Sequence, residues 1–204
     1  DLNQRVQVVI CPWRVLARQL GSRKACFRVN FSYCDWTMRY NRNVISYIAI
    51  SLDGYIAKPD GDISFLSRVE KEGVDYGYSD FLKTVDTIIL GRRTYDKIKD
   101  IGFGYPEDKE IYIISHNTGS EDNNLKYYSG PLKNLISGIR NEQGKNIFCD
   151  GGSDILTQLL YDNLIDEFVI SIIPVILGDG IRLFRDGRPE LDLKLISSRE
   201  FDTG

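Results

Sequence analysis

Hydrophobic residues in this chain fall into short, nearly continuous runs that alternate with longer amphipathic stretches. Runs rich in Ile and Val predict strands over residues 44–50, 87–90, 110–115, 146–149, 167–176 and 191–196. The stretches between them predict helices over residues 79–85, 94–99, 131–142 and 153–163. Strands alternating with helices indicate an α/β fold, and runs that are apolar on both faces are typical of strands inside a parallel sheet.

Two of these helices carry start signals. Pro131 is expected in the first turn of its helix, where a missing N–H costs nothing. Ser153 or Asp154 is expected to cap the following helix, since short polar side chains can accept a hydrogen bond from its first turn.

Residues 1–37 differ in composition from the rest of the chain. They contain six Lys/Arg, two Asp and no Glu, a net charge of +4, so the other residues carry −7 of the total of −3. An Arg-rich, acid-poor segment is typical of a transit peptide, whereas Met38 precedes an ordinary first strand. We predict an extension over 1–37, non-native or unstructured, and one domain over 38–204. The alternatives are a targeting or partner-binding arm and an integral part of the fold.

Composition narrows the classes of function. The acidic body argues against nucleic-acid binding, and no run of about 18 apolar residues predicts a membrane span. His116 is the single histidine, which disfavours His-rich metal sites and His-dependent hydrolytic triads. The four cysteines fit neither a disulfide framework nor a zinc site, so we expect no metal and a cytoplasmic location.

Glycine and arginine follow the predicted strand 87–90 directly. Gly91 permits close approach of a ligand, and Arg92, Arg93 and Thr94 open a helix whose N–H groups and dipole favour an anion. The pattern predicts a phosphate-binding turn. A solvated basic turn is the alternative.

A second glycine turn follows the predicted strand 146–149. Gly151 and Gly152 precede a helix that begins with Ser153 and Asp154, and two such turns at the same strand ends would face one ligand. Neither turn has the spacing of a dinucleotide-binding Rossmann motif or of a nucleotide-hydrolysing phosphate loop. A tight turn without a ligand remains open for this glycine pair.

Two further polar clusters end predicted strands. Ser115 ends the predicted strand 110–115 and His116 follows it; both could bind a ribose phosphate, although a solvated loop histidine is equally consistent. Ser51, Asp53 and Tyr55 follow the first strand, at the end where α/β sheets bind small molecules. For Asp53, function and turn chemistry both remain open.

Taken in order, these segments resemble the dihydrofolate-reductase-like superfamily, most closely the branch that holds the reductase domain of riboflavin biosynthesis and its small stand-alone relatives. The matching stretches are SLDGYIA, ILGRRTYD, IISHNT, CDGGSDIL and DEFVISIIPVILGDGIRLF, which span roughly residues 44–185. The resemblance implies a three-layer α/β/α fold with a central mixed, mostly parallel sheet. It also implies an NADPH-dependent reductase of a pteridine- or ribosylaminopyrimidine-like molecule, and a homodimer.

The resemblance also implies roles for individual residues. The cofactor would be bound by Gly91, Arg92, Arg93, Thr94, Ser115, His116, Gly151, Gly152, Ser153, Asp154 and Ile155. The substrate would contact Ser51, Leu52, Tyr55 and Phe65, and Asp53 is the candidate catalytic residue. The alternatives are dihydrofolate reductase activity and a non-catalytic nucleotide-binding module of the same fold.

Three departures from the family pattern bear on these expectations. The carboxylate that dihydrofolate reductases place in their first helix has no secure counterpart, with Glu70, Glu72 and Asp75 as candidates. The zinc deaminase motif of the bifunctional riboflavin enzyme is absent from this sequence. The chain also ends where relatives continue into a last strand, which predicts an open sheet edge.

Overall fold

The computed structural model describes residues 4–10, 42–117, 119, 124–187 and 190–203. The chain divides into two compact units, one made of residues 1–31, 47–76 and 167–204 and the other of residues 32–46 and 77–166. Strand β2 (Val44–Ser51) begins in the second unit and ends in the first. All of the residues that are expected to bind the cofactor lie in the second unit.

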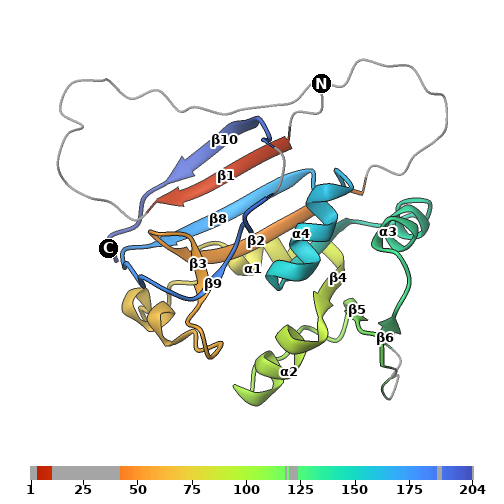
Figure 1. Ribbon diagram of the computed structural model, residues 1–204, viewed down its shortest axis with the longest axis horizontal. Helices are drawn as coiled ribbons and strands as arrows, with labels where there is room; N and C mark the ends of the chain where they lie inside the picture. Colours follow the sequence, from red (N-terminus) through yellow and green to blue (C-terminus); the bar gives the residue numbers. More distant parts are fainter. Residues whose placement is uncertain (1–3, 11–41, 118, 120–123, 188–189, 204) are drawn as a thin grey trace. The chain divides into compact units, whose positions relative to one another are not determined.

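The second unit is a parallel sheet with helices on both faces. Its elements are α1 (Tyr78–Lys83), β4 (Val85–Gly91), α2 (Arg92–Asp100), β5 (Glu110–Ile114), β6 (Leu125–Tyr128), α3 (Leu132–Arg140), β7 (Asn146–Gly151) and α4 (Ser153–Tyr161). The strand order is β2-β7-β4-β5-β6, and neighbouring strands run parallel. Figure 1 shows α4 in front of these strands and α1 behind them. The predicted mostly parallel α/β fold is confirmed.

Burial on both faces explains the continuous apolar run in β4. Ile88, Ile89 and Leu90 are each 0% exposed, although neighbouring residues of a strand point to opposite faces. On one face, Phe148 of β7 makes an edge-to-face contact with Phe81 of α1, with the ring centroids 5.0 Å apart. The core of this unit therefore lies on both sides of its central strands.

The helices α3 and α4 follow the predicted apolar spacing but begin differently from the prediction. In α3 the buried residues Leu132, Leu135, Ile136 and Ile139 recur at helical spacing. Pro131 is the N-cap of α3 rather than part of its first turn, because its extended backbone precedes the first helical residue. The N-cap of α4 is Gly152, so the expectation that Ser153 or Asp154 caps it is wrong.

The first unit contains a parallel sheet and a small antiparallel pair. Its elements are β1 (Gln4–Ile10), part of β2, β3 (Tyr55–Ala57), a 3-10 helix (Ser64–Val69), β8 (Glu167–Ile173), β9 (Ile181–Arg182) and β10 (Leu193–Arg199). The strand order is β10-β1-β8-β2, and β1 pairs in parallel with both β10 and β8 (Figure 1). Strands β3 and β9 form a separate antiparallel pair.

Strand β1 comes from the segment that the sequence sets apart as an extension. Residues 4–10 pair with β8 over six positions and with β10 over six positions. The remaining residues before Met38 lie outside the described part of the chain. Polar and apolar side chains alternate over residues 5–8, and the segment ends in the apolar run 8–10, a local signal that is typical of a strand.

Two strand boundaries differ from the sequence prediction. Strand β8 ends at Ile173 rather than at residue 176, because Pro174 has no N–H to donate to a sheet. Strand β10 runs from Leu193 to Arg199, later than the predicted 191–196. Its polar second half, SSR, carries no apolar pattern that could have revealed it.

Candidate functional site

Three strands of the second unit end side by side. In the parallel register, Leu90 of β4 is opposite Gly151 of β7, and Gly91 is opposite Ile114 of β5. Carboxyl ends of parallel strands are where α/β sheets present ligand-binding loops. The structure therefore brings together, at one edge, the segments that follow residues 91, 114 and 151.

The two glycine turns are in direct contact. A Cβ atom built on Gly152 would lie 3.2 Å from Thr94 Oγ1, and one built on Gly91 would lie 3.3 Å from Ile155 Cγ1 and 3.9 Å from the nitrogen of Gly152. The peptide bond between Gly151 and Gly152 is cis. Larger residues at positions 91 and 152 would push the two turns apart.

Both turns lead into helices whose N-cap residue is a glycine. Helix α2 begins at Arg92 after Gly91, and α4 begins at Ser153 after Gly152. Glycine has no side chain that could accept a hydrogen bond from the first turn. The first N–H groups of a helix carry a partial positive charge. Two such termini, joined at their glycines, suit an extended anion such as a pyrophosphate.

The two arginines of the first turn differ in their contacts. Arg92 donates from Nε to both carboxylate oxygens of Asp96, at 2.7 and 2.9 Å, and its guanidinium lies 5.7 Å from the ring centroid of Tyr127. Arg93 is exposed and has no ion-pair partner among the described residues. Arg93 is thus available to an anionic ligand, while Arg92 is already oriented by a carboxylate and a ring.

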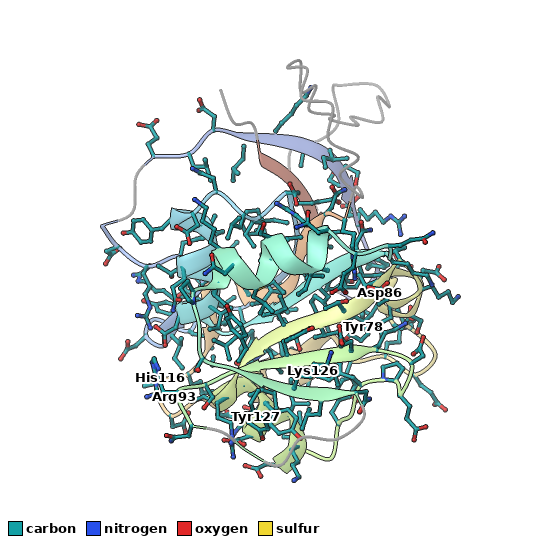
Figure 2. All side chains as sticks on the ribbon, turned by 90° about the vertical axis from the view of Figure 1, so that its right-hand side faces the viewer. Tyr78, Asp86, Arg93, His116, Lys126 and Tyr127 are labelled. Carbon is teal, nitrogen blue, oxygen red and sulfur yellow. The ribbon has the colours of Figure 1, made fainter. Side chains whose placement is uncertain are left out.

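The segment after β5 completes this edge. The Ser115 N–H donates to the Tyr128 carbonyl at 3.0 Å, and Ser115 Oγ accepts from the Asn117 N–H at 3.1 Å. These bonds fix the turn that carries His116. Figure 2 shows Arg93 and His116 near each other at one edge of the unit, as the register of β4 and β5 requires.

Sequence reasoning missed three residues at this edge. Tyr127 contacts Arg92, and Asp150 and Tyr105 form a hydrogen bond directly beside the Gly151–Gly152 turn. Tyr127 and Tyr105 left no local signal, since each lies far along the chain from its partner. Asp150 stands next to the glycines in CDGG and could have been flagged by that position.

The residues expected to bind substrate belong to the first unit. Ser51 and Phe65 are buried, Tyr55 is 7% exposed and Leu52 is 60% exposed. Ser51 Oγ donates to Asp53 Oδ1 at 2.6 Å and accepts from the Tyr55 N–H at 2.9 Å. The guanidinium of Arg182 lies 4.8 Å from the Tyr55 ring centroid. Ser51 therefore links the end of β2 to the start of β3.

Asp53 fastens a second loop of the same unit. Its carboxylate accepts from the N–H groups of Leu177 and Gly178, at 3.1 and 2.7 Å. Burial favours a higher pKa for Asp53, but the hydrogen bonds from Ser51, Gly178 and Leu177 outweigh it and hold the pKa below its ordinary value. These contacts are those of a loop-fastening carboxylate, and the catalytic role of Asp53 stays a prediction.

Replacing Asp53 with asparagine should remove a pH-dependent part of the stability. Because the folded protein lowers the Asp53 pKa, the ionised carboxylate stabilises it above the ordinary value of 3.8, and this is lost as the pH falls through the lowered pKa. We expect Asp53→Asn to cost about 1 kcal/mol at pH 7, with solvent weakening the bonds, and nearly nothing at a pH below the lowered pKa of Asp53. Urea unfolding at both pH values measures the difference.

A matched variant distinguishes the loss of the Asp53 hydrogen bonds from a general effect of removing a negative charge. Asp60→Asn changes an exposed carboxylate in the neighbouring turn, which accepts only from the Asp62 N–H among the described residues. If Asp53→Asn and Asp60→Asn lose the same stability at both pH values, the fastening role of Asp53 is wrong.

The chain is similar to a known protein family and to two proteins of Bacillus subtilis (strain 168). Residues 106–204 match the model of the RibD C-terminal domain family. The chain is 40% identical over 162 residues to the uncharacterized protein YwjB of Bacillus subtilis (strain 168), covering 78% of this chain and 92% of YwjB. This chain belongs to the RibD C-terminal domain family. A second uncharacterized Bacillus subtilis protein, YyaP, is 29% identical over 175 residues, which is 80% of this chain and 91% of YyaP.

Solved structures agree with membership of the RibD C-terminal domain family. A protein from Shewanella sp. PV-4 that is named for riboflavin biosynthesis is similar with a TM-score of 0.66 and 29% identity, over 72% of this chain and 86% of that one. Dihydrofolate reductase from Enterococcus faecalis, complexed with NADP(H) and RAB-propyl, is similar with a TM-score of 0.50 and 15% identity, over 76% of this chain and 82% of that one. The second likeness shows the fold alone. The expected superfamily and fold are confirmed, and a reductase is the class of enzyme that they support.

Membrane insertion has no support among the helices of the described residues, since none is long and apolar enough to cross a bilayer.

Proposed function

We propose that this member of the RibD C-terminal domain family is an NADPH-dependent reductase of a pteridine- or ribosylaminopyrimidine-like molecule. 5-Amino-6-(5-phosphoribosylamino)uracil is the first substrate to test. The carrying observation is the close approach of the two glycine turns, which brings together two helix N-termini with glycine N-caps beside Arg93, for which no ion pair is found among the described residues. Three positively polarised groups at one edge match the phosphates of a dinucleotide.

The cofactor would use residues of one unit only. Gly91 and the glycine pair 151–152 would let the backbone approach the pyrophosphate, with N–H groups of the first turns of α2 and α4 as donors. Arg92, Arg93, Ser115 and His116 would contact the phosphate on the adenosine side. The remaining contacts with the cofactor would come from Thr94, Ser153, Asp154 and Ile155. When bound, NADPH supplies the hydride, and the chain supplies orientation.

Arginine side chains at this edge support NADPH over NADH. The two cofactors differ by one phosphate, and a charge-assisted hydrogen bond contributes roughly 1.5–3 kcal/mol. Arg93 is available to make such a bond, and Arg92 is oriented by Asp96. We therefore expect tighter binding of NADPH than of NADH.

Replacing both arginines with alanine should weaken NADPH by about 100-fold and NADH by less than about threefold, because only the phosphate contact is lost. Titration calorimetry of wild type and of Arg92→Ala/Arg93→Ala with each cofactor measures this. Lys99→Ala is the control, since it removes one positive charge from the last turn of the same helix. Equal losses for both cofactors would show that the arginines do not read the phosphate.

Turnover distinguishes an enzyme from a binding module. Wild-type protein with NADPH should be assayed for cofactor oxidation with 5-amino-6-(5-phosphoribosylamino)uracil and with dihydrofolate. Oxidation with the first substrate supports the proposal, and oxidation with dihydrofolate alone favours the folate alternative. Tight NADPH binding without oxidation of either substrate would favour a non-catalytic module.

We also propose a homodimer that works in the cytoplasm. Four of the seven residues of β8 have buried apolar side chains, namely Phe168, Val169, Ile170 and Ile173. A strand this apolar could lie inside a larger assembly as well as inside one chain, which supports the dimer. Analytical ultracentrifugation at micromolar concentration tests the dimer, and a monomer at every concentration would rule it out.

A further inference from the structure

Asp150 and Tyr105 form a hydrogen-bonded pair next to the Gly151–Gly152 turn. The Tyr105 hydroxyl donates to Asp150 Oδ2. Asp150 is the last side chain of β7 before the glycines, and Tyr105 lies in the loop between α2 and β5. Both side chains are half-buried. Neither residue is among those proposed to bind the cofactor.

The surroundings of Asp150 favour its protonated form. Loss of water raises the Asp150 pKa to about 7, although the hydrogen bond from Tyr105 lowers it. The other titratable groups near the pair are Tyr78 of α1 and Cys149 of β7. No cation forms an ion pair with Asp150 among the described residues. Since Tyr105 occupies Oδ2, the acid proton belongs on Oδ1.

Reduction of a C=N bond needs a proton as well as a hydride. A general acid is most effective when its pKa is close to the working pH. Burial is the usual way to raise the pKa of a carboxylic acid to that range. The Cys149 thiol is a poor source because burial raises its pKa to about 12, and the Tyr105 hydroxyl is a poorer one because its pKa is raised further. Among these three groups, Asp150 is therefore the acid with suitable chemistry.

We propose that Asp150 is the proton donor of the reduction and that Tyr105 is its positioning residue. This inference rests on the proposed function. Bound NADPH would supply the hydride to the carbon of the substrate C=N bond, and the π electron pair would move to nitrogen. The Oδ1–H bond of Asp150 would break as the N–H bond forms. The substrate would thus be reduced by two electrons at the expense of NADPH, and the carboxylate would regain its proton from water.

Three variants test the donor role in the full chain. Asp150→Asn keeps the shape but cannot supply an acid proton, so kcat should fall about 100-fold, while the Kd for NADPH changes less than about threefold. Asp150→Glu keeps the acid and should restore part of kcat. Tyr105→Phe removes the bond that lowers the Asp150 pKa, so the alkaline fall of kcat, near pH 7 in wild type, should move to higher pH. Tyr112→Phe, in a half-buried tyrosine of β5, is the control and should leave the profile in place.

A second measurement needs neither substrate nor cofactor. In ¹³C NMR spectra of protein labelled at the aspartate carboxyl carbons, one resonance should titrate near pH 7 in wild type, be absent in Asp150→Asn and titrate at higher pH in Tyr105→Phe. If Asp150→Asn does not fold, the Tyr105→Phe shift carries the test. No resonance titrating between pH 6 and 8, or an unchanged kcat profile in the variants, overturns the donor role.

The outcomes separate this inference from the proposed function. If wild type binds NADPH and reduces 5-amino-6-(5-phosphoribosylamino)uracil while Asp150→Asn keeps its kcat, only the donor role fails. If wild type neither binds NADPH nor turns over that substrate, the proposed function fails and the donor role fails with it, whatever the NMR titration shows.

Discussion

Replacing Arg42 with methionine should lower the free energy of unfolding by about 3 kcal/mol, because it removes a buried guanidinium from an ion pair and from three further acceptors. Arg42 is 5% exposed and forms an ion pair with Asp86 through Nη2. The same nitrogen donates to Thr87 Oγ1 at 2.7 Å. Urea unfolding of wild type and Arg42→Met measures the loss, and an unchanged m-value shows that the variant changes stability alone.

The size of this effect comes from the number of groups that one guanidinium satisfies. Arg42 Nε donates to the Lys145 carbonyl at 2.7 Å, and Nη1 donates to the Ile139 carbonyl at 3.3 Å. Methionine fills similar volume but donates nothing, so two carbonyls and a hydroxyl lose this donor together, while Asp86 keeps the Thr87 hydroxyl and the Lys145 N–H as donors. A buried acceptor without a partner costs more than the bond itself contributes.

An exposed pair in the same unit is the matched control. Lys83 and Asp80 form an ion pair in which the side chains are 75% and 84% exposed. Lys83→Met should change the free energy of unfolding by less than about 1 kcal/mol, as is typical for surface pairs. If Arg42→Met costs no more than Lys83→Met, the network around Arg42 does not stabilise the fold.

The strand and helix pattern was predictable because burial on both faces leaves a local record. Continuous apolar runs marked β2, β4, β5 and β7, and periodic Leu and Ile marked α3 and α4. The Arg42 network left no such record, since Asp86 is 44 residues away and Lys145 is 103 residues away along the chain. A polar residue at the edge of a strand looks exposed until its partners are known.

The candidate site was predictable in part for the same reason. Glycine after a buried strand and before a helix is a local signal, so Gly91 and Gly152 could be found from the sequence. The contact between their turns, and the pairing of Tyr105 with Asp150, depend on which strands are neighbours. Single-sequence patterns do not contain that information.

The two glycines of the LGDG stretch look equivalent in the sequence but differ in their surroundings. Gly178 has φ +79° with no heavy atom within 4 Å of a Cβ built on it. Gly180 has φ +151°, and a Cβ there would lie 2.2 Å from the Ala57 carbonyl oxygen and 3.2 Å from Tyr55 Cδ1. Both positions strain an L side chain, but only position 180 also brings it into the backbone of β3.

Gly180→Ala should therefore lower the free energy of unfolding by roughly 4 kcal/mol or more, because β9 must move away from β3 to relieve the clash. Gly178→Ala should cost only about 1–3 kcal/mol, which is the strain of the left-handed backbone alone. Urea unfolding of the two single variants gives both values, and their difference isolates the cost of the close approach to Ala57. If both variants lose the same free energy of unfolding, β9 can move away from β3 at no cost. Gly180 would then be required for its backbone conformation and not for the packing of β9 on β3.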